Sequence, residues 1–149
     1  MPAGSEPALP RTYRPLGVRV AAVVLGALLV AATATIWFAF PPEVRAQFTT
    51  FQRVTVLALG GSFYAAGFAL ARSRLVARSD GITVVNGYRR RHYQWNEVLG
   101  VSLRGGSPWA VLDLSDGTSV PAMGIQGSDG ARATRQVREI RGLVERLTR

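Results

Sequence analysis

The sequence predicts an α+β membrane protein, in which a two-helix transmembrane hairpin is followed by an antiparallel sheet or partial barrel capped by a C-terminal α-helix. Residues 20–40 and 54–71 form two uncharged apolar segments, and each is long enough to cross the roughly 30 Å hydrocarbon layer as a helix. From residue 72 onward, short alternating segments are separated by turn signals, as in an antiparallel sheet. Residues 129–147 carry apolar side chains at helical spacing.

Composition narrows the class of protein. The chain has 149 residues, of which 48% are hydrophobic, more than the core of one small soluble domain would need. It has no cysteine and a single histidine, His92, so disulfides, thiolate nucleophiles and multi-histidine metal sites are excluded. All 18 basic residues are arginine and the net charge is +9. For a membrane-bound chain this charge favours the anionic inner leaflet over nucleic acid as the partner.

Residues 1–19 are expected to form a flexible cytoplasmic tail. Four prolines interrupt this segment and no periodic apolar pattern runs through it. A secretory signal peptide is the alternative, because Ala32-Thr33-Ala34 resembles a cleavage site. The apolar segment continues through Trp37 and Phe38, however, which favours a spanning helix with interfacial aromatic residues.

Arginine placement predicts the orientation of the hairpin. Pro41 and Pro42 end the first span, since proline cannot donate to the helical ladder. Only Arg45 and Arg53 lie between the spans, whereas three arginines flank the hairpin on each outer side: Arg11, Arg14, Arg19, Arg72, Arg74 and Arg78. Both termini and the domain after residue 72 are therefore expected in the cytoplasm, with the chain a multi-pass protein of the cell membrane.

Small residues recur at four-residue spacing within the spans, at Gly61, Ala65 and Ala69 in the second and at Ala22 and Gly26 in the first. Such faces let helix backbones approach closely. Packing within the hairpin is the favoured interpretation, and homo-oligomerisation is left open. Neither span contains an ionisable residue, so the sequence offers no proton relay or ion pathway.

Six strands are expected after the hairpin. Asp80-Gly81, Asn86-Gly87 and Asp116-Gly117 mark turns, and Asn-Gly is expected to form a type I′ turn because both central residues then need positive φ. The strands are expected at residues 75–78, 82–85, 88–95, 99–103, 109–114 and 118–123.

A helix over residues 129–147 is expected to close the sheet. Its apolar residues step by four and three, which places them on one face. This face is expected to contact the sheet through Ala133, Val137, Ile140, Val144 and Leu147.

Three short motifs in the predicted sheet point to a known family: Asp80-Gly81-Ile82-Thr83-Val84, Trp95-Asn96-Glu97-Val98 and Leu112-Asp113-Leu114-Ser115-Asp116-Gly117. They resemble the signature of bacterial PH-domain proteins. With two spans in front, the chain is similar to small actinobacterial membrane proteins, a family that includes the mycobacterial low molecular weight protein antigen 6. The resemblance implies a PH-like domain over residues 72–149 and brings no agreed biochemical activity with it. It implies structural roles for Gly81, Asn86, Gly87, Trp95, Glu97, Asp116 and Gly117.

The candidate binding residues are Arg89, Arg90 and Arg91, next to His92. Eukaryotic PH domains bind inositol phosphates with basic residues at their first hairpin, and the Asn86-Gly87 turn is expected to correspond to it. Alternation along a strand sends Arg89 and Arg91 one way and Arg90 the other. The competing interpretation is a charged edge strand that resists aggregation.

The other polar and aromatic candidates are expected to be structural. Trp95 and Trp109 begin or end strands and are expected in the core. Asp113, Asp116 and Gly117 do not have the spacing of a calcium loop. No nucleophile, base and orienting group come together in the sequence, so we expect no enzyme, no cofactor and no metal.

Two functions remain. The first, which we favour from the sequence, is a membrane-anchored adaptor that docks a protein partner at the inner leaflet. The second is a module that recognises an anionic lipid headgroup through the arginine cluster. Arginines next to the membrane would attract anionic lipid in either case, at about 1 kcal/mol each, so the sequence separates these functions only weakly.

Overall fold

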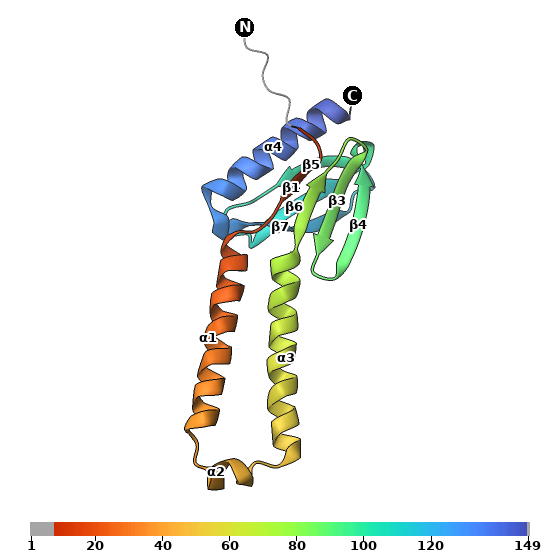
Figure 1. Ribbon diagram of the computed structural model, residues 1–149. Coiled ribbons are helices and arrows are strands. Elements are labelled where there is room, and N and C mark those ends of the chain that lie inside the picture. Colours follow the sequence, from red (N-terminus) through yellow and green to blue (C-terminus); the bar gives the residue numbers. More distant parts are fainter. Residues whose placement is uncertain (1–7, 149) are drawn as a thin grey trace.

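The computed structural model describes residues 8–148 of the chain. Two long helices, α1 (Gly17–Ala39) and α3 (Thr50–Arg72), run side by side away from a domain of strands, and the short α2 (Pro42–Gln47) joins their far ends (Figure 1). Each long helix has 23 residues, or about 35 Å at 1.5 Å per residue. Both are long and apolar enough to span a membrane, and their apolar side chains are not buried in the protein. The predicted hairpin is confirmed at this level.

Both helices begin before the apolar segments do. Arg19 lies in the first turn of α1 and Arg53 in that of α3, because a charge ends an apolar run without ending a helix. Thr49 caps α3, since its hydroxyl accepts the amide of Gln52 while the Gln52 side chain accepts the amide of Thr49.

Aromatic and arginine side chains meet at both ends of the hairpin. At the far end, the ring of Trp37 contacts Phe48 and the guanidinium of Arg53. At the domain end, Arg72 lies over the ring of Tyr88 at 5.2 Å. Such groups are typical of the two membrane–water interfaces.

The small residues of the spans separate into two groups. The hydroxyl of Tyr64 donates to the carbonyl of Gly26, and a Cβ on Gly26 would lie 3.1 Å from that hydroxyl oxygen. This contact holds α1 to α3. A Cβ on Gly61 would meet no atom within 4 Å, whereas Ala69 lies against Gly87 of the domain and the carbonyl of Ala65 accepts the hydroxyl of Tyr88.

The domain contains a four-stranded and a three-stranded antiparallel sheet, and α4 (Ala131–Leu147) packs against them (Figure 1). The first sheet has the order β1-β2-β3-β4, with strands at Arg11–Tyr13, Arg74–Ala77, Gly81–Asn86 and Arg89–Gln94. The second has the order β5-β6-β7, with strands at Val98–Ser102, Trp109–Leu114 and Ser119–Gln126. Short 3₁₀ turns, η1 (Trp95–Glu97) and η2 (Gly127–Asp129), precede β5 and α4. The α+β prediction with a PH-like domain is confirmed.

The strand β1 corrects the prediction of a flexible tail over residues 1–19. Tyr13 pairs with Leu75 of β2, and its side chain is only 2% exposed. Residues 17–19 belong to α1, and residues 1–7 lie outside the described part of the chain. A three-residue strand is too short to show an alternating pattern in the sequence. Its presence becomes clear only from its pairing with the edge of β2 in the folded domain. The hairpin is therefore inserted between two neighbouring strands of one sheet.

Helix α4 covers the core with a face slightly different from the predicted one. Ala133, Val137, Ile140 and Val144 are buried as expected. Leu147 is 37% exposed, so its predicted burial is wrong, and Leu143 takes that place at 3% exposed. Leu147 ends the helix, beyond the edge of the core.

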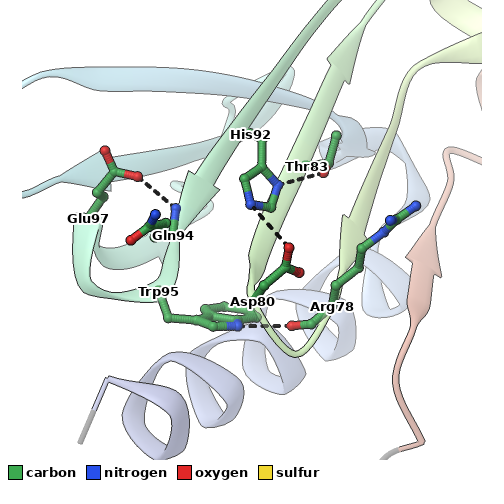
Figure 2. Close-up of polar contacts among 7 residues, drawn as sticks. All are labelled: Arg78, Asp80, Thr83, His92, Gln94, Trp95 and Glu97. Carbon is green, nitrogen blue, oxygen red and sulfur yellow. Dashed lines mark hydrogen bonds and ion pairs between the residues drawn. The ribbon is translucent and has the colours of Figure 1, made fainter.

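Several residues of the PH signature have structural roles. A Cβ on Gly81 would lie 2.1 Å from the carbonyl oxygen of Tyr93, so only glycine fits there. The indole of Trp95 donates to the carbonyl of Arg78 at 2.9 Å, and the carboxylate of Glu97 accepts the amide of Gln94 at 2.7 Å (Figure 2). These bonds fix the turn before β3 and the turn after β4.

The Asp116-Gly117 turn is also structural. Gly117 has a φ of +83°, which favours glycine. The carboxylate of Asp116 accepts the hydroxyl and the amide of Thr118, and these bonds lower the pKa of Asp116.

The β3–β4 hairpin differs from the predicted type I′ turn. Asn86 ends β3 and pairs with Arg89, so Gly87 and Tyr88 are the two loop residues. Gly87 has a φ of +59°, and no described residue other than glycine has a positive φ, which is the φ pattern of a type II′ turn. Asn86 stays in the strand because its amide bonds to the backbone of Pro121 and Met123 in β7.

Candidate functional site

The β3–β4 hairpin is fastened to the last turns of α3. The Ser73 side chain is buried, and its hydroxyl accepts the amide of Gly87 at 3.0 Å and donates to the carbonyl of Ala69 at 3.0 Å. A Cβ on Gly87 would lie 3.3 Å from that of Ala69, so glycine allows this close approach. At the loop, the Tyr88 hydroxyl donates to the carbonyl of Ala65 at 2.9 Å.

The start of α1 is held as well. The two carboxylate oxygens of Asp129, at the end of η2, accept the amides of Leu16 and Gly17 at 2.8 Å each. A carboxylate at this position satisfies free amides and complements the helix dipole. Both membrane helices are thus bonded to the domain, which gives the domain a defined position relative to the hairpin.

A groove of about 650 Å³ lies between the end of α3, the β3–β4 hairpin and the start of β7. Arg89 and Arg91 line it from β4. The opposite walls are largely apolar and come from Ala66, Ala69 and Leu70 of α3 and Val120, Pro121 and Met123 of β7. Two positive charges and an apolar wall therefore share one opening.

Strand register determines which arginines reach the groove. Arg91 is paired with Val84 and Arg89 with Asn86, and all four line the groove. Arg90 is paired with Val85, and neither of these residues lines it. The alternation thus divides the cluster as the sequence predicts.

The side chains of Arg89 and Arg91 are exposed, and neither forms a salt bridge with an acidic residue within residues 8–148. Their charges are available to an anion from outside. The strand β4 also lies at the edge of its sheet, so the cluster also meets the description of a charged edge strand.

The expected correspondence with the first hairpin of eukaryotic PH domains is wrong. The Asn86-Gly87 turn joins the third and fourth strands, whereas the first two strands are joined through the membrane hairpin. The strands β2 and β3 already form a hairpin before this turn, and β1 adds a further strand in front of them.

His92 lies outside the groove. Its Nδ1 is 3.0 Å from the hydroxyl of Thr83, and its Nε2 is 3.7 Å from the carboxylate of Asp80 (Figure 2). These contacts tie β4 to β3 and to the turn before it. Within residues 8–148 no three acidic, histidine or cysteine residues group as metal ligands would.

The two tryptophans differ in burial. Trp95 is 4% exposed and belongs to the core, as expected, whereas Trp109 at the start of β6 is only partly buried. Neither residue lines the groove.

Sequence reasoning missed the apolar walls of the groove. The small residues Ala65 and Ala69 were recognisable as a close-approach face, and the helix partner was the expected neighbour. The face instead packs against the β3–β4 hairpin. The sequence does not indicate that this face of α3 lies beside β4, because no local pattern of residues encodes a contact between distant segments.

Comparisons with known proteins agree with this architecture. Residues 72–143 match the family model described as Bacterial PH domain. An uncharacterized protein of Mycobacterium tuberculosis and one of Mycobacterium bovis are each 40% identical to the chain over 99 residues. That match covers 66% of this chain and 64% of each relative, less than two thirds of their length. No solved structure matches the chain significantly. These relatives do not bear the name low molecular weight protein antigen 6, so that similarity stays a prediction.

Proposed function

We propose that this chain is a non-enzymatic integral membrane protein that holds its PH-like domain at the cytoplasmic face of the membrane and binds an anionic phospholipid headgroup there. The observation that carries the proposal is the groove in which Arg89 and Arg91 face the last turns of the membrane helix α3. A lipid phosphate beside α3 would be within reach of both guanidinium groups.

The orientation rests on charge. The end of the hairpin next to the domain carries Arg14, Arg19, Arg72 and Arg74, whereas the far end carries Arg45 and Arg53. Arginine-rich flanks stay in the cytoplasm. The groove would then open at the inner leaflet, whose surface potential is negative.

Guanidinium groups suit this ligand because their planar fork of N–H donors matches phosphate oxygens. Each exposed arginine near the surface contributes about 1 kcal/mol to the attraction of anionic lipid. Selectivity over other exposed arginines would come from the groove, where two of them converge on one ligand.

An adaptor that docks a protein partner at the inner leaflet is the alternative function. It needs no ligand in the groove, and the exposed surfaces of the sheets and of α4 remain available for it. An unchanged lipid preference after removal of the groove charges would favour it.

The test uses the full chain in nanodiscs made of phosphatidylcholine with a minor fraction of phosphatidylglycerol. Enrichment of phosphatidylglycerol around the protein is measured by native mass spectrometry of the released complex. The double variant Arg89→Gln/Arg91→Gln is compared with Arg90→Gln/Arg104→Gln, which removes the same charge outside the groove.

We expect the first variant to lower the preference for phosphatidylglycerol about tenfold or more, because it removes two charge-assisted contacts that converge on one phosphate, and such contacts are stronger than the attraction of an isolated exposed arginine. The control should stay within about threefold of wild type. Equal losses in both variants would reduce the binding to general surface charge and would contradict the proposal.

A further inference from the structure

We infer that the groove takes a membrane-resident phospholipid that enters sideways from the bilayer and keeps part of an acyl chain on α3, and that it does not take a water-soluble phosphate. This inference rests on the proposed function and specifies its ligand. It follows from the depth of the β3–β4 hairpin and the continuity of the apolar wall.

The hairpin reaches below the end of the membrane helix. The Tyr88 hydroxyl bonds to the carbonyl of Ala65, seven residues before Arg72 at the end of α3. At 1.5 Å per residue, this is about 10 Å down the helix axis. The loop extends beside the top turns of α3 (Figure 1), at a depth where an exposed tyrosine fits the headgroup region.

The groove is open to the lipid side. Ala66 is exposed and Leu70 is 42% exposed, and both belong to the apolar surface of α3 as well as to the groove wall. An acyl chain lying on this wall stays in apolar surroundings along its whole length. A soluble headgroup would leave the same wall uncovered.

The depth is fixed by bonds at the hinge. The buried Ser73 hydroxyl accepts the amide of Gly87, and the Tyr88 hydroxyl donates to the carbonyl of Ala65, so the hairpin cannot lift away from α3 without breaking both hydrogen bonds. Arg89 and Arg91 follow the loop directly and so remain at headgroup level while the apolar wall extends below them.

The experiment measures binding of phosphatidylglycerol to the full chain in uncharged detergent micelles by native mass spectrometry, with glycerol phosphate as the soluble competitor. Ala66→Phe fills the apolar part of the groove with a side chain that a membrane helix tolerates. Ala58→Phe is the matched control, because Ala58 is also exposed on α3 and lies outside the groove. Arg89→Gln/Arg91→Gln is measured alongside.

We expect Ala66→Phe to weaken phosphatidylglycerol binding about tenfold, because the phenyl ring overfills the space that the acyl chain would occupy, and Ala58→Phe to leave it unchanged. Glycerol phosphate should not compete at millimolar concentration. Competition by glycerol phosphate, or equal effects of the two alanine variants, would overturn the sideways entry while the arginine variant still shows headgroup binding. Loss of any arginine effect would instead overturn the proposed function itself.

Discussion

Neighbouring residues of one type have different environments along β4. Arg89 and Arg91 point into the groove beside α3, while Arg90 is paired with Val85 outside it. The difference arises from strand alternation. Replacing all three arginines together would therefore combine a loss of groove contacts with a loss of surface charge. Arg90 has to be replaced separately from Arg89 and Arg91 to distinguish the two effects.

Tyr13 is the residue whose titration the fold changes most clearly. Burial raises the pKa of its hydroxyl to about 12, and the negative charge of Glu139 contributes in the same direction. Its side chain is only 2% exposed, so ionisation is unfavourable in the folded state.

Because this pKa is raised from 10.0 to about 12, the neutral hydroxyl contributes its full stability below pH 10, and the contribution is lost as the pH rises toward 12. The shift corresponds to about 3 kcal/mol of unfolding free energy. We expect Tyr13→Phe to remove this part of the alkaline destabilisation. Urea unfolding of the detergent-solubilised chain at several pH values between 9 and 12 measures it.

Glu139→Gln serves as the control for the cause. This substitution removes the charge of residue 139 but leaves Tyr13 buried. Because burial is the larger cause of the raised pKa, most of the pH dependence of the unfolding free energy should remain. Parallel stability curves for wild type and Tyr13→Phe would show that Tyr13 ionises as freely in the folded state as in the unfolded chain.

At the scale of elements, α4 shows how the docked face of a helix is selected. Periodicity identifies the apolar side, and the extent of the core determines which turns are covered. Arg141 adds a specific contact, because its Nε donates to the carbonyl of Val101 in β5 at 2.8 Å. The last turn of the helix projects past this contact, which leaves Leu147 exposed.

Two leucines on this helix provide a matched test. Leu143→Asp places a charge in the core and should lower the unfolding free energy by about 3 kcal/mol or more. Leu147→Asp changes an exposed position and should cost about 0.5 kcal/mol. Urea unfolding followed by tryptophan fluorescence distinguishes the two. The reverse order would show that α4 docks through the face first expected from the sequence.

For the whole molecule, the main feature is that the membrane hairpin lies within the domain. The strand β1 enters the first sheet before α1, and β2 continues directly after α3. A fragment that starts at residue 72 therefore lacks a strand whose Tyr13 belongs to the core. The full chain is the appropriate material for binding experiments, because membrane anchoring and folding of the domain use the same two connections.

Topology is the prediction at this scale. We expect alkaline phosphatase fused to the C-terminus to be inactive in cells, and the same enzyme inserted in Pro42–Gln47 to be active, since arginine-rich flanks remain in the cytoplasm. The opposite pattern would place the domain on the side of the membrane that faces away from the cytoplasm. It would also remove the anionic inner leaflet as the source of the ligand.

The sequence by itself determined the features that depend on local spacing. The lengths of the apolar segments identified the two membrane helices, and β6 was predicted with the same bounds that the structure shows, Trp109–Leu114. The alternation that separates Arg90 from its neighbours was also predictable. Each of these follows from a period or a length that neighbouring residues establish together.

Only the tertiary structure decided which distant segments meet. It added β1 to the sheet, placed Asp129 at the start of α1, and set Ala66 and Leu70 opposite the arginines of β4. These contacts join residues far apart in the chain, and each involves too few residues to produce a period. The edge of β2, the amides of Leu16 and Gly17 and the apolar face of α3 each gain a partner through hydrogen bonding or burial. Those partners come within reach only when the chain folds.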